Sequence, residues 1–364
     1  MKFRVPGRTE LAGNHTDHQG GHVIAAAIDV FMSAEAEKTG GSEIIISSRG
    51  FGELRAELGA AGPRQSEKGR PEALVRGTAE RLSQQGYETG AFKAEISSDI
   101  AVGSGLSSSA AFEILIGSII SGLYNGGKIP PAALAEAGKY AENVYFGKPS
   151  GMMDQCACAY RGIIAVDFRN EDSPEVRRID ADLGRAGYRI VLTDTGGSHS
   201  GLTPHYAAIT REMGEIAAFF GEKVLSRVNR EAFFASVAEL RAAAGDRAVL
   251  RAMHWFDENE RVIQMTAALS RGDMGKYLEL MDDSGRSSAE LLQNSYADPS
   301  SQGISLALAR SREILGKRGA ARVHGGGFAG TVQAIMPEDA AGKYISAMED
   351  IFGEGSCRTV KTTY

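Results

Sequence analysis

The chain has 364 residues, 43% of them hydrophobic and 24% charged, and a formal net charge of −6. This composition is typical of an ordinary globular protein, and the acidic balance disfavours a broad basic surface for nucleic acid. The length suits two domains better than one compact core.

The cysteines and the hydrophobic pattern bear on location. Cys156, Cys158 and Cys357 are too few for a disulfide framework, which favours a reducing compartment. Cys156 and Cys158 have no second ligand pair nearby, so we interpret them as small apolar residues in a packed segment. No stretch reaches the ~18 apolar residues of a membrane span. Residues 1–20 also lack a signal-peptide pattern. We therefore expect a cytoplasmic protein without membrane or nucleic-acid partners.

The first half of the chain predicts short strands and two helices. Strands are expected at Glu43–Ser48, Phe92–Ser97, Gly162–Phe168 and Tyr188–Thr193. Ser109–Leu123 is apolar all round and predicts a buried helix. Pro131–Phe146 has proline at its start and Gly147 after its end, which predicts a second helix.

The second half is mainly helical. Amphipathic patterns predict helices at His205–Val224, Asp246–Ser270, Met274–Asp283 and Gly303–Gly316. The chain then ends as a small βαβ-type layer. A strand and a glycine loop are followed by a strand at Thr331–Met336, a helix at Pro337–Phe352 and a closing strand at Cys357–Thr362. The polar segment 171–184 favours a boundary between two domains, 1–180 and 181–364.

Three glycine-rich stretches concentrate the candidate chemistry: Gly7–Val23, Gly103–Glu113 and His324–Val332. The first begins within ten residues of Met1, so no extra strand is expected ahead of it. The second places Gly-Ser-Gly and three serines before a helix, where free backbone N–H groups favour phosphate. An ordinary serine N-cap is the alternative. The chain has neither a GxxxxGK[ST] motif nor a Rossmann fingerprint.

The first stretch and an isolated aspartate suggest a sugar and a phosphoryl group. Arg8 is a fixed cation suited to phosphate, and Asn14, His15, Asp17 and His18 offer short polar contacts to a sugar. A glycine-rich turn with incidental polar residues is the alternative. The third stretch, Gly325–Gly330, could close over a ligand or simply turn between two strands.

Asp154 follows two methionines in an apolar segment, where a carboxylate needs a partner or a task. One such task is general base for a sugar hydroxyl. A structural aspartate capping a turn is the alternative.

These motifs together resemble the GHMP small-molecule kinases and, within them, the galactokinases. The resemblance covers Gly7–Gly21, GLSSSAA, GMMDQ, GGGFAG, Arg251–Val262 and Leu280–Leu292. It implies an α+β fold (α/β, two-layer) of two domains with the active site in the cleft between them. It also implies transfer of the γ-phosphate of MgATP to the anomeric hydroxyl of galactose, giving galactose 1-phosphate. ATP and Mg²⁺ are then the cofactors, and we expect a monomer, with a homodimer as the open alternative.

The same resemblance implies residue roles. Arg8 and Asp154 match the catalytic residues, and Ser109 and Glu142 match those that hold magnesium. The sugar contacts implied are Asn14, His15, Asp17, Gly151 and Tyr206. The ATP phosphate loop implied is Gly103, Gly105, Leu106, Ser107, Ser108, Ser109 and Ala110.

The chain departs from the galactokinase signature at three positions. Asn14 replaces a glutamate that contacts the hydroxymethyl end of the sugar, His18 replaces a tyrosine and Glu10 an asparagine. Losing that glutamate should weaken galactose binding by about 1–3 kcal/mol unless Asn14 compensates. It also removes repulsion of a carboxylate. The run HTDHQGG resembles galacturonate kinases.

Galactose is therefore the first expectation, and galacturonate or a related sugar is the alternative. A non-catalytic sugar sensor is a remote alternative, disfavoured by the intact GLSSSAA, Arg8 and Asp154.

Overall fold

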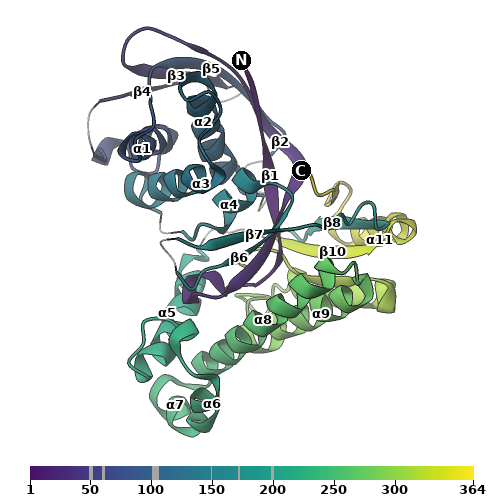
Figure 1. Cartoon of the computed structure of the whole chain (residues 1–364). Helices are drawn as coiled ribbons and strands as arrows, with labels where there is room; N and C mark the ends of the chain where they lie inside the picture. Colours follow the sequence, from purple (N-terminus) through teal and green to yellow (C-terminus); the bar gives the residue numbers. More distant parts are fainter. Residues whose placement is uncertain (49–51, 60–61, 101–105, 149, 171–172, 198–200) are drawn as a thin grey trace. The chain divides into compact units, whose positions relative to one another are not determined.

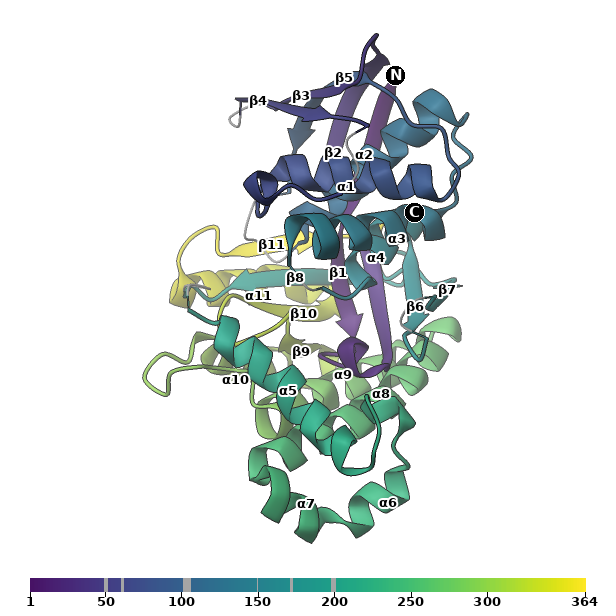
Figure 2. The same ribbon diagram turned by 90° about the vertical axis from the view of Figure 1, so that its left-hand side faces the viewer.

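A computed structural model describes residues 1–364 except 49–51, 60–61, 101–105, 149, 171–172 and 198–200 (Figures 1 and 2). The chain forms two compact units. Unit 1 contains Met1–Arg8, Ala27–Gly162 and Thr363–Tyr364, and unit 2 contains Thr9–Ala26 and Ile163–Thr362. The units are therefore not consecutive halves of the sequence, and the domain boundary near residue 180 stays a prediction.

Two long strands contribute residues to both units. β1 spans Lys2–Ala12 and β2 spans His22–Lys38. β1 begins at Lys2, so the opening residues of the first glycine-rich motif lie within a strand. The other elements of unit 1 are β3 (Glu43–Ser48), β4 (Gly52–Glu57), a 3₁₀ turn (Gln65–Glu67), α1 (Pro71–Gln84), β5 (Phe92–Ser98), α2 (Ser108–Tyr124), α3 (Pro131–Tyr140), a π-helical turn (Ala141–Phe146) and α4 (Met153–Tyr160).

Unit 1 packs its helices against a mixed sheet. β3 pairs antiparallel with β4 and parallel with β5, which also pairs antiparallel with the C-terminal half of β2. Figures 1 and 2 show α1, α2 and α3 together on one side of these strands. Two glycines allow close helix contacts. A Cβ on Gly77 of α1 would lie 2.7 Å from the Ala141 Cα, and one on Gly117 of α2 would lie 2.8 Å from Leu134.

Unit 2 contains the remaining elements. They are a 3₁₀ turn (Asp17–Gln19), β6 (Ile163–Asp167), β7 (Glu175–Ile179), β8 (Tyr188–Asp194), α5 (Thr203–Phe219), a 3₁₀ turn (Leu225–Arg227), α6 (Arg230–Ala235), α7 (Val237–Ala244), α8 (Asp246–Ser270), α9 (Met274–Ser287), a π-helical turn (Ser288–Leu292), α10 (Gly303–Leu315), a 3₁₀ turn (Gly316–Arg318), β9 (Ala320–Val323), β10 (Thr331–Pro337), α11 (Glu338–Phe352) and β11 (Cys357–Val360).

The C-terminal layer of unit 2 is a split βαβ arrangement. β10 and β11 both pair antiparallel with β8, which lies between them in the order β11-β8-β10-β9. The βαβ-type ending that the sequence predicts is therefore confirmed. The sequence did not predict that β8, which lies far away along the chain, is inserted between β10 and β11.

The helical part of unit 2 has a core of its own. Trp255 and Phe256 of α8, with Phe233 and Met213, are buried in one hydrophobic cluster. Figure 1 shows α8 and α9 side by side. None of the helices in the described ranges has the length and apolar character needed to cross a bilayer.

Most predicted elements are confirmed, and several ends differ. β3 and α8 have the predicted bounds, while α5 ends at Phe219 rather than Val224 and α9 continues to Ser287. The predicted helix Pro131–Phe146 is α-helical only to Tyr140 and then becomes a π-helical turn. Such turns interrupt the regular hydrogen-bond ladder and are frequent at functional sites.

Candidate active site

Arg8 and Asp154 form a two-point ion pair within unit 1. Arg8 lies in the buried part of β1 and Asp154 in the first turn of α4. The Arg8 Nε donates to Asp154 Oδ1 at 2.6 Å and its Nη2 donates to Oδ2 at 2.8 Å. Parallel N–H···O⁻ bonds of this kind are strong and fix both side chains. The Arg8 side chain is 9% exposed and that of Asp154 is 30% exposed, so solvent can still reach the carboxylate.

Ser107 completes this arrangement, which we name the Asp154 cluster (Arg8, Ser107, Asp154). The Ser107 hydroxyl donates to Asp154 Oδ2 and makes no capping bond to α2. The simple N-cap alternative is therefore wrong for this serine. Its φ of 57° is unusual for a residue with a side chain, and strain of this kind collects at functional sites.

The ion pair keeps Asp154 ionised. Burial alone would raise the pKa of this carboxyl, but the charge and hydrogen bonds of Arg8, with the Ser107 hydroxyl, outweigh it and lower the pKa. Asp154 is therefore a fixed negative charge at neutral pH.

A second carboxylate, Glu142, lies in the π-helical turn of unit 1 and is bonded at both oxygens. Oε1 accepts from Lys148 Nζ at 2.8 Å and from the Ser109 hydroxyl at 3.4 Å. Oε2 accepts from the Ser150 hydroxyl at 2.6 Å and from Gln155 Nε2 at 3.1 Å. We name these five residues the Glu142 cluster. It contains both residues predicted to hold magnesium.

The Glu142 cluster fits a Mg²⁺ ion that also binds phosphate oxygens. Mg²⁺ is usually held by one or two carboxylates together with substrate phosphates and water. One carboxylate and one neighbouring hydroxyl match that donor set, and the Lys148 ammonium shows that the carboxylate already attracts a cation. No group of three or more His, Cys, Asp or Glu side chains placed for a metal occurs in the described ranges, so an all-protein metal cage has no support there.

Sequence reasoning missed Glu113, which lies beneath this cluster. Gln155 Nε2 donates to Glu113 Oε2 at 2.9 Å as well as to Glu142. Burial, followed by the charge of Glu142, raises the pKa of Glu113 well above its usual range. A lone acid within the apolar helix Ser109–Leu123 was the signal that could have found it.

The remaining predicted residues of unit 1 have simpler settings. Leu106 is buried and its carbonyl accepts from the Arg8 backbone N–H, while Ala110 is buried in α2. Ser108 begins α2 and Gly151 is exposed three residues before Asp154. Gly103 and Gly105 lie outside the described residues.

In unit 2, Asn14 is buried and its side chain is fully hydrogen-bonded to the protein. Its Nδ2 donates to the Gly325 carbonyl at 2.7 Å and to Glu10 Oε1 at 3.4 Å. Its Oδ1 accepts from Asn294 Nδ2 at 2.8 Å and from the Ser288 hydroxyl at 3.4 Å. An amide has two donors and room for two acceptor bonds, so the capacity of Asn14 is used. We name these five residues the Asn14 network.

His15 and Tyr206 meet the same glycine loop as Asn14. The His15 Nε2 lies 3.0 Å from the Gly326 carbonyl, and the Tyr206 hydroxyl donates to the Gly327 carbonyl at 3.0 Å. A Cβ on Gly326 would lie 2.6 Å from the Tyr206 ring, so glycine is required for this contact. Asp17 begins the 3₁₀ turn that follows and is half-buried. The structure thus brings the first and third glycine-rich motifs together within unit 2.

A buried charged layer supports the loop that carries Asn14. Glu258 Oε1 accepts from the Gly13 backbone N–H at 3.1 Å and from the Ser284 hydroxyl at 2.7 Å. Burial would raise the pKa of Glu258, but His254 and neighbouring arginines outweigh it and bring the pKa to about 2. His254 Nε2 in turn donates to the Asn14 carbonyl at 3.0 Å. The sequence analysis included Glu258 and His254 only within the segment Arg251–Val262 and predicted no role for them.

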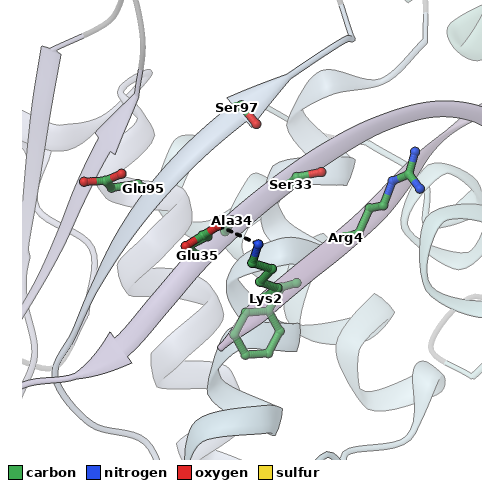
Figure 3. Close-up of a pocket in the computed structure, with 8 residues that line it drawn as sticks. Lys2, Arg4, Ser33, Ala34, Glu35, Glu95 and Ser97 are labelled. Carbon is green, nitrogen blue, oxygen red and sulfur yellow. Dashed lines mark ion pairs between the residues drawn. The ribbon is translucent and has the colours of Figure 1, made fainter.

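A cavity of about 360 Å³ lies elsewhere in unit 1, and Figure 3 shows its lining. Lys2, Arg4, Glu35 and Glu95 line it from neighbouring strands, and the first and third of these form an exposed ion pair at 3.1 Å. Such pairs contribute about 0–1 kcal/mol. None of the residues predicted for the site lines this cavity, so it is not the candidate active site.

Comparison with known proteins decides the family. Residues 1–38 match the galactokinase galactose-binding signature, and residues 73–162 match the GHMP kinases N-terminal domain. The chain is 31% identical over 342 residues to galactokinase of Actinobacillus pleuropneumoniae, covering 92% of this chain and 85% of that protein. The chain belongs to the galactokinase family. The first match contains Arg8 and the loop of Asn14, and the second contains Ser107, Glu142 and Asp154.

Solved structures agree with this assignment. The crystal structure of Lactococcus lactis galactokinase complexed with galactose matches with a TM-score of 0.82 and 25% identity, covering 99% of this chain and 92% of that chain. Methanococcus jannaschii mevalonate kinase matches with a TM-score of 0.64 and 16% identity, covering 100% and 98%, which supports the fold alone. The α+β GHMP kinase fold that the sequence predicted is therefore confirmed.

Proposed function

We propose that this galactokinase-family chain transfers the γ-phosphate of ATP to the anomeric hydroxyl of a hexose, with galactose as the first sugar. The observation that carries the proposal is the Asp154 cluster. A carboxylate fixed by Arg8 at 2.6 and 2.8 Å, with a loop serine on the same oxygen, is suited to orient a hydroxyl for attack on phosphorus. The family assignment supports the same reaction.

In the proposed step the anomeric oxygen forms a bond to the γ-phosphorus while the bond from phosphorus to the ADP oxygen breaks. The sugar proton passes to Asp154 Oδ and then to solvent. Because its pKa is low, Asp154 is a weak base, so we expect it to accept the proton late, as the new bond forms. Loose phosphoryl-transfer transition states need little prior activation of the nucleophile.

Arg8 has two tasks in this proposal. It holds Asp154 in place, and its guanidinium stabilises negative charge on the transferring group. Glu142 and Ser109 would hold Mg²⁺, which neutralises charge on the phosphate oxygens when bound. The loop before α2, including Ser107, Ser108 and Ser109, would bind the ATP phosphates.

A second sugar, galacturonate, is favoured by one observation. Asn14 replaces the family glutamate with a neutral amide whose hydrogen bonds all go to protein groups. No carboxylate at position 14 then repels a carboxylate on the sugar.

Three free cysteines fit action in a reducing compartment such as the cytoplasm.

The test is a panel of hexoses and hexuronates with ATP and Mg²⁺, measuring both ATP consumption and sugar 1-phosphate. We expect galactose 1-phosphate, with the highest kcat/KM for galactose. A strong preference for galacturonate would replace the first sugar by the second. The absence of phosphorylation with every sugar, in a folded protein that binds ATP, would reject the proposed function.

A further inference from the structure

His18 has two buried ring nitrogens without a hydrogen-bond partner on any other described residue. The residue lies in the 3₁₀ turn Asp17–Gln19 of unit 2, and its ring centroid is 5.6 Å from that of His15. His15 itself is bonded to the Gly326 carbonyl, beside the ring of Tyr206. His18 therefore lies next to residues predicted to contact the sugar.

Two other histidines of unit 2, His22 and His254, do not share this feature. His22 Nδ1 lies 2.8 Å from Asn259 Oδ1, and its Nε2 lies 3.3 Å from Asp167 Oδ2. His254 is bonded at both nitrogens, to Ser287 and to the Asn14 carbonyl. The missing partners on both ring nitrogens therefore distinguish His18 from His22 and His254.

An unpartnered buried imidazole is costly, and the cost calls for an explanation. Each buried donor or acceptor without a partner loses the hydrogen bonds that it would make to water in the unfolded chain. Burial lowers the pKa of His18 to about 3, so the ring is neutral and offers one N–H donor and one acceptor. That pair of groups matches a sugar hydroxyl, which both accepts and donates.

The state of Asn14 leaves a polar contact to be supplied. Its amide groups are used by Gly325, Glu10, Asn294 and Ser288, so Asn14 has no remaining capacity for the sugar. His18 lies four residues further along the same segment, and its hydrogen-bonding groups are not used by other described residues.

We propose that His18 is a sugar-binding, specificity-determining residue, whose neutral imidazole hydrogen-bonds a hydroxyl of the bound hexose. This inference rests on the proposed sugar-kinase function. In this chain the hydrogen bond to the sugar is then supplied by residue 18 instead of residue 14, while the side chain of Asn14 stabilises the glycine loop through Gly325.

The decisive variant is His18→Phe, which keeps a ring and removes both nitrogens. Removing unpartnered polar atoms should leave the melting temperature of the sugar-free protein unchanged or raise it. The same change should lower kcat/KM for galactose by about tenfold to a hundredfold, mainly through KM. A purely structural histidine would show the reverse pattern, a lower melting temperature with unchanged kinetics.

Two further measurements sharpen the test. His18→Gln and His18→Asn each keep amide groups near one ring nitrogen, so one of them should recover most of the lost kcat/KM. Deoxygalactoses lacking one hydroxyl each should show one sugar for which wild type and His18→Phe no longer differ. His22→Gln is the matched control, from a partnered histidine of the same unit, and its KM should match that of wild type.

The outcomes separate the two proposals. A wild-type protein that phosphorylates no sugar rejects the function on which the inference rests. An active wild type whose His18→Phe variant keeps its KM on every sugar overturns the role of His18 alone.

Discussion

The predicted site residues of unit 1 and those of unit 2 differ in the interactions that hold their side chains. In unit 1 the Asp154 and Glu142 clusters are each centred on an ion pair. In unit 2 the Asn14 network joins amides, a hydroxyl and a backbone carbonyl to one carboxylate, that of Glu10, and the ring nitrogens of nearby His18 have no partner on any other described residue. Charge-assisted pairs fix both side chains in one geometry, whereas replacing a neutral amide such as that of Asn14 does not leave a buried charge without its partner. Under the proposed function, the sugar preference can therefore change through substitutions in unit 2 while the residues proposed for phosphoryl transfer stay the same.

The largest expected effect comes from the charge at position 154. Asp154→Asn keeps the shape but removes the acceptor of the sugar proton and the charge partner of Arg8. We expect kcat to fall by roughly 10²–10⁴, measured with saturating sugar and ATP. A variant that binds both substrates and keeps near-normal turnover would show that Asp154 is not a base.

Glu136→Gln is the matched control for that experiment. It breaks another arginine–carboxylate pair of unit 1, with Arg81 Nη2 and Glu136 Oε1 2.6 Å apart, in which the arginine is more exposed than Arg8. Such pairs contribute about 0–1 kcal/mol, so kcat should stay at the wild-type value.

The next effect tests whether the Asn14 network is structural. Asn14→Glu restores the family residue, but it removes the donor to the Gly325 carbonyl and places a second carboxylate beside Glu10. We expect the free energy of unfolding to fall by about 1–3 kcal/mol in urea titrations. If the variant is as stable as wild type and binds galactose more tightly, the network is not what excludes glutamate here.

The magnesium prediction concerns the Glu142 cluster. Glu142→Ala removes the only carboxylate proposed for the ion, so the Mg²⁺ concentration for half-maximal activity should rise at least about tenfold. Lys148→Gln is its control, because it removes a competing cation from the same carboxylate at 2.8 Å and keeps the proposed ligand. Its Mg²⁺ requirement should not rise. Equal requirements in all three proteins would argue against Glu142 as a ligand.

The contrast between the units also explains what the sequence could predict. Most helices and strands follow from local patterns, such as the apolar run of α2 or the amphipathic length of α8. Arg8 and Asp154 could be named from motifs, but their two-point bond joins residues 146 positions apart, and no local pattern encodes that. The π-helical turn at Glu142 was not predicted from the helix pattern of Pro131–Phe146; its first residue, Ala141, lies close to Gly77 of α1, a contact that no local pattern encodes.

Specificity was harder to predict than catalysis for a related reason. Asn14 could be recognised as a departure, yet its four bonds come from Glu10, Ser288, Asn294 and Gly325, which span most of the chain. Whether a substituted residue faces the sugar or the protein depends on those partners. A motif therefore shows that position 14 has changed, whereas only the fold shows that its new amide is already occupied.

The smallest expected effect is a pH dependence confined to unit 2. Burial lowers the pKa of His18 to about 3 and also lowers that of His254, so both favour the unfolded state when protonated. Their stabilising contribution is complete above the unfolded histidine pKa near 6.5 and is lost as the pH falls below it. Each such histidine adds a slope of up to about 1.4 kcal/mol per pH unit. The free energy of unfolding, measured by urea titrations between pH 7.5 and 5, should therefore change less steeply with pH for His18→Phe than for wild type. Equal slopes would mean that His18 gains a proton in the folded protein, and its ring would then lie in a polar setting rather than a buried one.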